Sequence, residues 1–302
     1  MHTTASDGRL SPVDLVARAA AAGLTTISVT DHDTIAALAE VTAAAAAQGI
    51  RVVPGIEITA IDQGRDVHML GYFFDPESAP LAALLGSQRA LRVLRVREIA
   101  RTLASLHMPI DIEGVLLAAA ARPGSSVGRP QVARALVGAG HVPSVQDAFD
   151  RWLATGRPAF VPRTGPTPPE VIEAIHGAGG VASFAHPGVT GRDELIAPLV
   201  DRGLDAIEVY HSDHTADDVV AYRGLAIRLG ALASGGSDFH GEDASKPERI
   251  RRATLGGVTL PAADFAALER KARLRPASAE ASTSAKATAD RSARQAASGE
   301  TG

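Results

Sequence analysis

Short apolar runs, rich in β-branched residues, alternate with segments of helical composition along most of the chain. The runs predict strands near residues 24–29, 51–56, 67–74, 181–185, 204–210, 231–237 and 253–258. Helices are predicted from Ser11-Pro12 to Gly23, at 35–47 and at 168–179. Strands and helices that alternate with short loops are typical of parallel sheets with right-handed crossovers, so we expect an α/β protein.

Residues 79–160 break this alternation because they contain helical patterns and no predicted strand. The helices are predicted near 79–106, 111–121, 129–139 and 144–154. We therefore expect a helical insertion over 77–162 that divides one α/β unit into 1–76 and 163–275. Beyond it, residues 276–302 consist mainly of Ala, Ser, Thr and charged residues without periodicity, which predicts a disordered tail.

Residues that can bind a metal follow several of the predicted strands. The carboxyl ends of parallel strands meet at one edge of a sheet, so these side chains are expected to gather in one site. They are His32, Glu57, His186, Asp238 and His240. Simpler interpretations stay open: Asp31 or Asp33 as a helix N-cap, Glu57 on a surface loop, and 238–240 as a turn.

Composition narrows the chemistry of such a site. The chain has 302 residues, enough for one α/β barrel or two ordinary domains. Its lack of cysteine excludes thiolate ligands, which leaves imidazole and carboxylate. A net charge of −4 gives no electrostatic footprint for duplex nucleic acid. No membrane-length apolar run or signal peptide is present, so we expect a cytoplasmic protein.

Seven short stretches, in order along the chain, resemble the PHP (polymerase and histidinol phosphatase) superfamily of metal-dependent phosphoesterases. Within it, the chain resembles the branch that acts on nucleoside 3′,5′-bisphosphates and on nucleotide 5′-ends. The stretches are His2-Thr3-Thr4-Ala5-Ser6-Asp7-Gly8, Thr30-Asp31-His32-Asp33-Thr34, Gly55-Ile56-Glu57, His68-Met69-Leu70-Gly71-Tyr72, Gly128-Arg129-Pro130, Ala185-His186-Pro187 and Ser237-Asp238-Phe239-His240.

The resemblance implies a distorted (β/α)7 barrel with a trinuclear metal site at the carboxyl ends of its strands. Residue by residue, it implies the ligands His2, Asp7, His32, Glu57, His68, His186, Asp238 and His240. One ion would be held by His2, Glu57 and Asp238, a second by Glu57, His68 and His186, and a third by Asp7, His32 and His240. Such nitrogen and oxygen ligands suit two to three Mn²⁺, Zn²⁺ or Fe²⁺ ions.

The chain departs from the family pattern at its start. The family opens with a strand that ends in His-x-His, and here only the second histidine, His2, is present, without the first strand. We expect the true start to lie upstream; the alternative is a first metal site with three protein ligands. A second departure is Gln131, where a histidine is frequent in this branch.

The expected reaction is hydrolysis of a phosphate ester by metal-activated water, so no side chain need act as nucleophile. Arg129 is the candidate phosphate clamp, although it can also be a surface residue at a helix start. Asp31 is a candidate catalytic residue, and a neighbouring aspartate could orient the imidazole of His32. His211 is a candidate substrate contact, with a solvated loop as the alternative.

The resemblance implies a nucleoside 3′,5′-bisphosphate 3′-phosphatase, a 5′-3′ exonuclease on short RNA, or both. Its partners would then be small nucleotides or short oligonucleotides. One alternative is a histidinol-phosphate or other small-metabolite phosphatase. Another, from a different class, is a non-catalytic metal-binding barrel, which the missing first histidine motivates.

Overall fold

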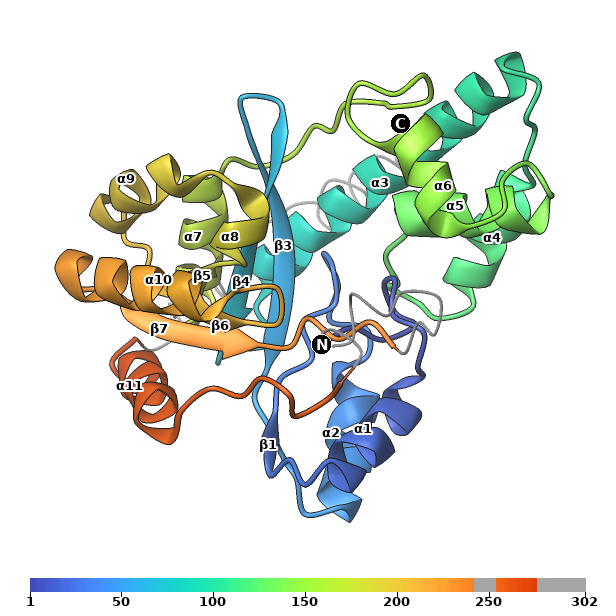
Figure 1. Cartoon of the computed structure of the whole chain (residues 1–302). Helices are drawn as coiled ribbons and strands as arrows, with labels where there is room; N and C mark the ends of the chain where they lie inside the picture. The colour runs from blue at the N-terminus through green and yellow to red at the C-terminus, as the bar shows by residue number, and fades with distance from the viewer. Residues whose placement is uncertain (242–253, 276–302) are drawn as a thin grey trace, which may run out of the picture.

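The computed structural model describes residues 1–241 and 254–275 (Figure 1). The chain begins with α1 (Pro12–Ala21), β1 (Thr26–Ile27), α2 (Leu38–Ala47) and β2 (Arg51–Val52). Ser11 caps α1 as predicted, because its Oγ accepts a hydrogen bond from the backbone N–H of Asp14 at 3.1 Å. β1 and β2 pair in parallel over only two residues each. Apolar side chains of both helices pack with Ile27 and Val29 in one core.

A second sheet supplies most of the site. It contains β3 (Gly55–Asp62), β4 (Arg65–Tyr72), β5 (Val181–Phe184), β6 (Ala206–His211) and β7 (Leu232–Gly236), in that order. β5, β6 and β7 are parallel, whereas β4 runs antiparallel to both of its neighbours. The sequence pattern predicts parallel strands; β4 is antiparallel to β3 because a tight turn at Gln63 and Gly64 joins the two strands. Both residues have positive φ, 48° and 76°, as in the two-residue turns that join antiparallel strands.

Helices cover this sheet and complete its core. They are α7 (Pro168–Gly177), α8 (Pro187–Thr190), the short 3₁₀ helix Asp193–Leu195, α9 (Ile196–Asp201), α10 (Ala216–Leu229) and α11 (Ala262–Arg273). α7 packs against β3, β4 and β5, α10 against β6 and β7, and α11 against β5 and β7. Fully buried side chains such as Ile58, Met69, Phe184 and Ile207 form the centre of this core.

The helices between β4 and β5 have a core of their own. They are α3 (Ala79–Ser105), α4 (Ile112–Ala120), α5 (Arg129–Gly138), α6 (Val145–Ala148) and the π-helix Phe149–Leu153, which continues α6. Val96, Ile99, Leu103, Val132 and Leu136 are fully buried among them. In Figure 1 these helices stand to the upper right of the sheet, and α3 leads out to them from it. None of the helices in residues 1–241 and 254–275 is long and apolar enough to cross a membrane.

Several predicted strands are shorter than expected or absent. Only Thr26–Ile27 of the run 24–29 forms a strand, and the run 51–56 is divided between β2 and the start of β3. Residues 254–258 contain no strand, so that prediction is wrong for these residues. Residue 253 and the predicted tail, 276–302, lie outside the described residues.

Besides the direct connection of β2 to β3, isolated backbone contacts link the two sheets. His32 and Glu57 form a single parallel bridge between the segment after β1 and β3. On the other side, the backbone N–H of Thr30 donates to the Met1 carbonyl, and that of His2 donates to the Phe239 carbonyl, both at 2.8 Å. Within the described residues, no strand lies between β1 and β7.

Candidate metal centre

All eight residues expected to bind metal lie together at one end of the two sheets. His32 follows β1, His186 follows β5, and Asp238 and His240 follow β7, while Glu57 and His68 lie within β3 and β4. His2 and Asp7 belong to the loop before α1. Each of the parallel strands β1, β5 and β7 thus delivers a ligand type at its carboxyl end, as the sequence predicted.

Glu57 is at the centre of this group. Its Oε1 lies 2.5 Å from Nδ1 of His68 and 3.2 Å from Nε2 of His186. Its Oε2 lies 3.2 Å from Nε2 of His2. One carboxylate therefore contacts histidines on two sides, the geometry expected of a residue that bridges two cations.

The other carboxylates extend the cluster in two directions. Asp238 Oδ1 lies 3.1 Å from His2 Nε2, so His2, Glu57 and Asp238 converge on one point. Asp7 lies 3.3 Å from Nε2 of His240 and 3.8 Å from Nε2 of His32. Two groups correspond to the expected trinuclear arrangement: His2, Glu57 and Asp238, and Asp7, His32 and His240 joined by His2. The third convergent group is His32, Glu57 and His68, with His32 in the place where His186 was expected.

The backbone is held in unusual conformations beside these ligands. Asp33, His186 and Asp238 all have positive φ, at 53°, 29° and 49°. Non-glycine residues rarely adopt this region, at a cost of about 1–3 kcal/mol each, and such residues concentrate at functional sites. This conformation occurs at two members of the cluster, His186 and Asp238, and at Asp33, whose carboxylate points to Arg92 and Arg163.

The charges of the cluster suit divalent cations. Burial raises the pKa values of Asp7, Glu57 and Asp238, but the surrounding histidines outweigh it and hold all three pKa values well below their ordinary value. Burial lowers the pKa of His32 to about 3, which keeps its imidazole in the neutral form that binds metal. Three ionised carboxylates are thus packed together with little access to water.

The imidazole nitrogens also need a partner. Both ring nitrogens of His2, Nδ1 of His32 and Nδ1 of His68 are buried, and the carboxylate oxygens near them do not lie in the directions that a hydrogen bond requires. Buried polar atoms without a partner are costly, and those in native proteins usually serve a ligand or an ion. The nitrogen and oxygen donors present therefore fit the two to three divalent ions inferred from the sequence.

Asp31 has a different role from the one expected. Its Oδ1 accepts hydrogen bonds from the Thr3 backbone N–H at 2.7 Å and from Ser6 Oγ at 2.6 Å, and its Oδ2 accepts from Thr3 Oγ1 at 2.7 Å. These contacts hold the carboxylate on the loop of Thr3 and Ser6, and they do not support the prediction that it orients His32. Asp31 instead fixes the loop that carries His2 and Asp7.

The two residues predicted to contact substrate, Arg129 and His211, are engaged with other parts of the protein. Arg129 donates hydrogen bonds to the Leu153 carbonyl and to Asp66, both at 3.4 Å, and lies over the rings of Phe149 and Phe160. His211 is buried, with Nε2 3.7 Å from Asp238 Oδ2. His211 is thus buried beside the candidate ligand Asp238, a position that does not favour direct contact with substrate.

Arg92 is the residue that the sequence analysis missed. It lines a small pocket together with Asp7, His32 and Gly128. Its Nε donates to Asp33 at 2.5 Å, and its two terminal nitrogens donate to the Val127 carbonyl and to Thr59. A pattern in the sequence could have indicated it: Arg89, Arg92 and Arg95 recur every third residue, which places them on one helix face.

Known proteins resemble this chain in sequence and in fold. A model of the PHP domain matches residues 1–153. A 5′-3′ exoribonuclease of Haemophilus influenzae is 39% identical over 244 residues, covering 79% of this chain and 88% of that protein. A 3′,5′-nucleoside bisphosphate phosphatase of Chromobacterium violaceum is 35% identical over 244 residues, covering 79% and 85%.

A solved structure from Bifidobacterium adolescentis, named for a suspected metal-dependent phosphoesterase, matches with a TM-score of 0.79. The two chains are 32% identical, and the match covers 89% of this chain and 94% of the other. The family model spans half of the chain and the relatives align with most of it, so the chain belongs to the PHP-domain family of metal-dependent phosphoesterases.

Proposed function

We propose that this phosphoesterase hydrolyses nucleotides that carry more than one phosphate, as a nucleoside 3′,5′-bisphosphate 3′-phosphatase, a 5′-3′ exonuclease on short RNA, or both. One observation carries the proposal: arginines gather beside the candidate metal centre in excess of the carboxylates that could neutralise them. The names of the Haemophilus and Chromobacterium relatives point to the same substrates.

The arginines form two linked groups. Arg92 and Arg163 both donate to the buried carboxylate of Asp33, and Arg89 donates to its backbone carbonyl. Arg129 pairs with Asp66 at 3.4 Å, and Arg95 lies close enough to both for their charges to act on it. Five guanidinium groups therefore surround two carboxylates.

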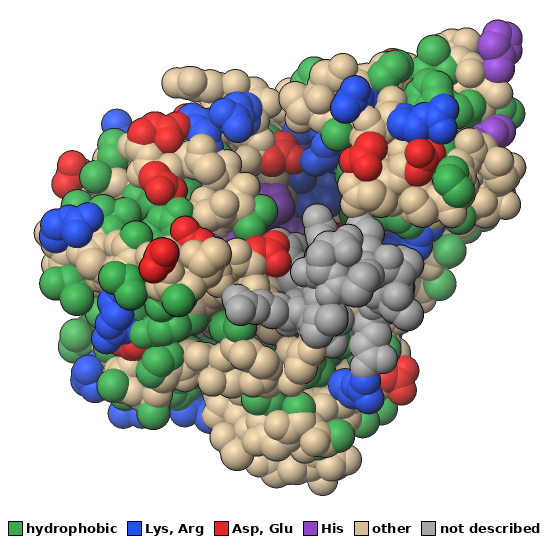
Figure 2. All heavy atoms as spheres, in the orientation of Figure 1, with side chains coloured by type: hydrophobic (Ala, Val, Ile, Leu, Met, Phe, Trp, Pro, Cys, Tyr) green, Lys and Arg blue, Asp and Glu red, His purple; other side chains and the backbone are tan. Residues whose placement is uncertain are grey.

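The electrostatics reflect this excess. Burial and the neighbouring charge of Arg129 lower the pKa of Arg95 to about 10, and burial and Arg92 do the same for Arg163. In Figure 2, Lys and Arg side chains and His side chains meet in the hollow between the sheet and the helices α3–α6. A phosphate group entering this hollow would supply the missing negative charge.

Arg92 is the best placed to hold a phosphate at the metal centre. A guanidinium has five N–H groups, and the described contacts of Arg92 engage three of them. Two remain for phosphate oxygens beside Asp7 and His32. Asp33 fixes the guanidinium from behind, so little side-chain entropy would be lost when it binds.

The eight clustered ligands are proposed to hold two to three divalent ions. When bound, such ions polarise the phosphate and lower the pKa of a coordinated water towards neutrality. The residues of the chain have separate tasks. Glu57 joins the two halves of the centre, Asp31 secures the loop of His2 and Asp7, and Arg92 orients the scissile phosphate.

We further propose that the two sheets form one distorted (β/α)7 barrel, with α3 to the π-helix as its insertion over 77–162. The bridge between His32 and Glu57 and the contacts of Met1 and His2 support this arrangement because they join the two sheets, although β1 and β7 do not pair with each other. In this arrangement the insertion carries Arg92 and Arg129 over the open end of the barrel and selects the substrate.

The experiment compares Arg92→Ala with Arg97→Ala, a matched control on the same helix whose side chain is exposed and pairs with Glu113. Phosphate release from adenosine 3′,5′-bisphosphate is measured with Mn²⁺, alongside metal content. A charge-assisted contact contributes about 1.5–3 kcal/mol, so Arg92→Ala should lower kcat/KM by about 10- to 150-fold. Arg97→Ala should match the unaltered enzyme, and neither variant should lose metal.

Two results would change the proposal. Full activity of Arg92→Ala would remove Arg92 as the clamp, and Arg129→Ala, measured in parallel, would then test the original candidate. A substrate panel that includes short RNA and histidinol phosphate decides the substrate class. Turnover of histidinol phosphate alone would contradict the nucleotide assignment and favour a small-metabolite phosphatase.

A further inference from the structure

The helical insertion contacts the backbone of residues 1–8, the ligand loop, which carries the candidate metal ligands His2 and Asp7. Three consecutive carbonyls of this loop each accept a hydrogen bond from a donor in the insertion. The pairs are the Ser126 N–H with the Ala5 carbonyl at 2.8 Å, Gln131 Nε2 with the Ser6 carbonyl, and Arg134 Nη1 with the Asp7 carbonyl at 3.3 Å. The insertion therefore fixes the path of the backbone up to and including a candidate ligand.

Gln131, where the sequence departs from the family pattern, uses both ends of its amide. Its Oε1 accepts from the Gly128 N–H at 2.9 Å, at the start of α5, while its Nε2 donates to the Ser6 carbonyl. A carboxylate offers only acceptors and an ammonium only donors, so neither could make both contacts. One side chain thus ties the start of α5 to the ligand loop.

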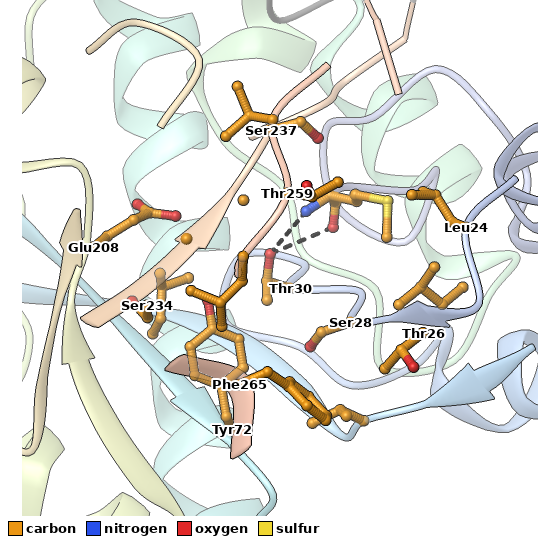
Figure 3. Close-up of a pocket in the computed structure, with 18 of the residues that line it drawn as sticks. Leu24, Thr26, Ser28, Thr30, Tyr72, Glu208, Ser234, Ser237, Thr259 and Phe265 are labelled. Atoms are coloured by element: carbon orange, nitrogen blue, oxygen red, sulfur yellow. Dashed lines mark hydrogen bonds between the residues drawn. The ribbon is translucent and has the colours of Figure 1, made fainter. Parts of the chain in front are cut away.

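The α/β part of the chain holds the ligand loop at different points. Asp31 accepts from the backbone and side chain of Thr3 and from Ser6 Oγ. Thr30, which borders a cavity of about 450 Å³, donates through Oγ1 to the Met1 carbonyl at 3.4 Å (Figure 3). These contacts secure the start of the loop and a side chain, whereas the insertion engages the three consecutive carbonyls.

The ligand loop has little room to move independently of the insertion. Ala5 is fully buried, and Ser126 is 2% exposed. A β-carbon at Gly8 would lie 2.4 Å from a carbonyl oxygen of the same loop, so the loop closes tightly on itself. Displacement of the insertion would leave buried carbonyls without donors, which is unfavourable. The position of the Asp7 carboxylate, 3.3 Å from His240 Nε2, therefore depends on contacts made by the insertion.

We infer that Gln131 is a positioning residue for Asp7, and that it couples metal binding to the docking of the insertion. The inference rests on the proposed binding of divalent ions by the cluster. An ion held by Asp7, His32 and His240 would fix the ligand loop, and the fixed loop presents its carbonyls to Ser126 and Gln131. Coupling between two sites is reciprocal, so the docked insertion raises the affinity for metal by the same factor.

The first test follows hydrogen exchange in the unaltered chain, with metal removed by a chelator and then with Mn²⁺ added. The Ser126 amide should exchange more slowly with Mn²⁺, by about fivefold or more, because the ion holds its acceptor, Ala5, in place. The Gly114 amide is the internal control, since it donates to Asp111 within the insertion at 2.9 Å. Its exchange should not respond to Mn²⁺. A Ser126 amide that is equally insensitive would overturn the inference.

The second test uses Gln131→Met, which removes both polar contacts and keeps the length of the side chain. Each lost hydrogen bond changes an equilibrium constant by about two- to tenfold. Calorimetric titration should therefore show Mn²⁺ affinity lowered by at least about twofold, and the protection of Ser126 by Mn²⁺ should shrink. Gln146→Met is the matched control, because this glutamine also lies in the insertion and donates to Asp150 at 2.6 Å. It should bind Mn²⁺ like the unaltered chain.

Urea unfolding of the metal-free proteins separates positioning from general support of the fold. If Gln131→Met is less stable without metal but binds Mn²⁺ with unaltered affinity, Gln131 only supports the fold and the inference is wrong. Failure of the proposed metal centre is recognised differently: Mn²⁺ would then neither bind nor raise the Tm of the unaltered chain. If Mn²⁺ binds and raises the Tm without protecting Ser126, the coupling alone is refuted.

Discussion

Asp205, just before β6, is a buried carboxylate outside the candidate metal centre, and its removal should be costly. Its oxygens accept from the Ala182 backbone N–H at 3.0 Å and from Arg275 at 2.7 and 3.1 Å, and His176 Nε2 lies 2.8 Å away. Lys271 is 3.3 Å from it. This side chain, at the start of β6, therefore contacts β5, α7 and α11.

The expected loss follows from these contacts. Asp205→Ala leaves the buried Ala182 N–H without an acceptor, at about 1–3 kcal/mol, and removes charge-assisted bonds to Arg275 worth about 1.5–3 kcal/mol. Lys271 and Arg275 are 43% and 25% exposed and can turn towards water, so their freed charges add little. We expect a fall of about 3–5 kcal/mol in the free energy of unfolding, as for other broken buried pairs.

Asp205→Asn removes the negative charge and keeps the size of the side chain. The amide oxygen still accepts from Ala182, so the loss should be smaller, about 1.5–3 kcal/mol. Burial raises the pKa of Asp205, but His176, Arg275 and the Ala182 N–H outweigh it and hold the pKa well below 3.8. A carboxyl with a lowered folded-state pKa stabilises the fold above its unfolded-state pKa and loses that contribution as the pH falls towards the folded value.

The assay is urea unfolding at fixed metal concentration, followed by circular dichroism at several pH values. The difference between the unaltered chain and Asp205→Asn should be complete near neutrality and shrink below about pH 4. Glu113→Gln, which breaks an exposed pair with Arg97, should unfold like the unaltered chain. A loss below about 1 kcal/mol in Asp205→Ala, or a difference independent of pH, would refute the reasoning.

Three further predictions concern packing and metal. Leu103→Ala, in the fully buried core of α3, should cost about 2–5 kcal/mol in urea unfolding, whereas Leu94→Ala on the exposed face of that helix should change little. Gly55→Ala would place a β-carbon 2.0 Å from Ser28 Oγ and should destabilise by about 1–3 kcal/mol, while Gly138→Ala meets nothing within 4 Å and should stabilise by up to about 1 kcal/mol. A chelator should lower the Tm, and added Mn²⁺ should restore it, because ions that bind only the folded chain stabilise it; a Tm insensitive to both would contradict metal binding.

The ligand cluster could be predicted from the sequence because its geometry is set locally. His32, His186 and Asp238 each follow an apolar run, and parallel strands place their carboxyl ends at one edge. The reversal of β4 was also present in the sequence, in the two-residue turn at Gln63 and Gly64, but the apolar pattern of residues 67–74 does not carry a direction.

The roles of Asp31 and Arg92 could not be predicted in the same way, because each depends on contacts between distant segments. Asp31 reaches back 25 to 28 residues to the loop of Thr3 and Ser6. Arg92 reaches Asp33 across 59 residues, which requires α3 to lie beside the segment that follows β1. The local sequence pattern identifies residue types that suit a metal. Which arginine lies beside them, in contrast, depends on the tertiary structure.

This division has a chemical reason. A metal centre needs its carboxylates free of competing cations, and an arginine beside Asp7 would otherwise pair with it. Asp33 is fully buried and engages Arg92 and Arg163 through one oxygen, Oδ2, so both guanidinium groups are held at the edge of the centre by a carboxylate that is not a candidate ligand. The arginines then remain available for phosphate, while Asp7 and Glu57 remain available for metal. The adjacent pair His32-Asp33 thus separates two charged groups: His32 faces the cluster of candidate metal ligands, and Asp33, with its positive φ, faces the arginines.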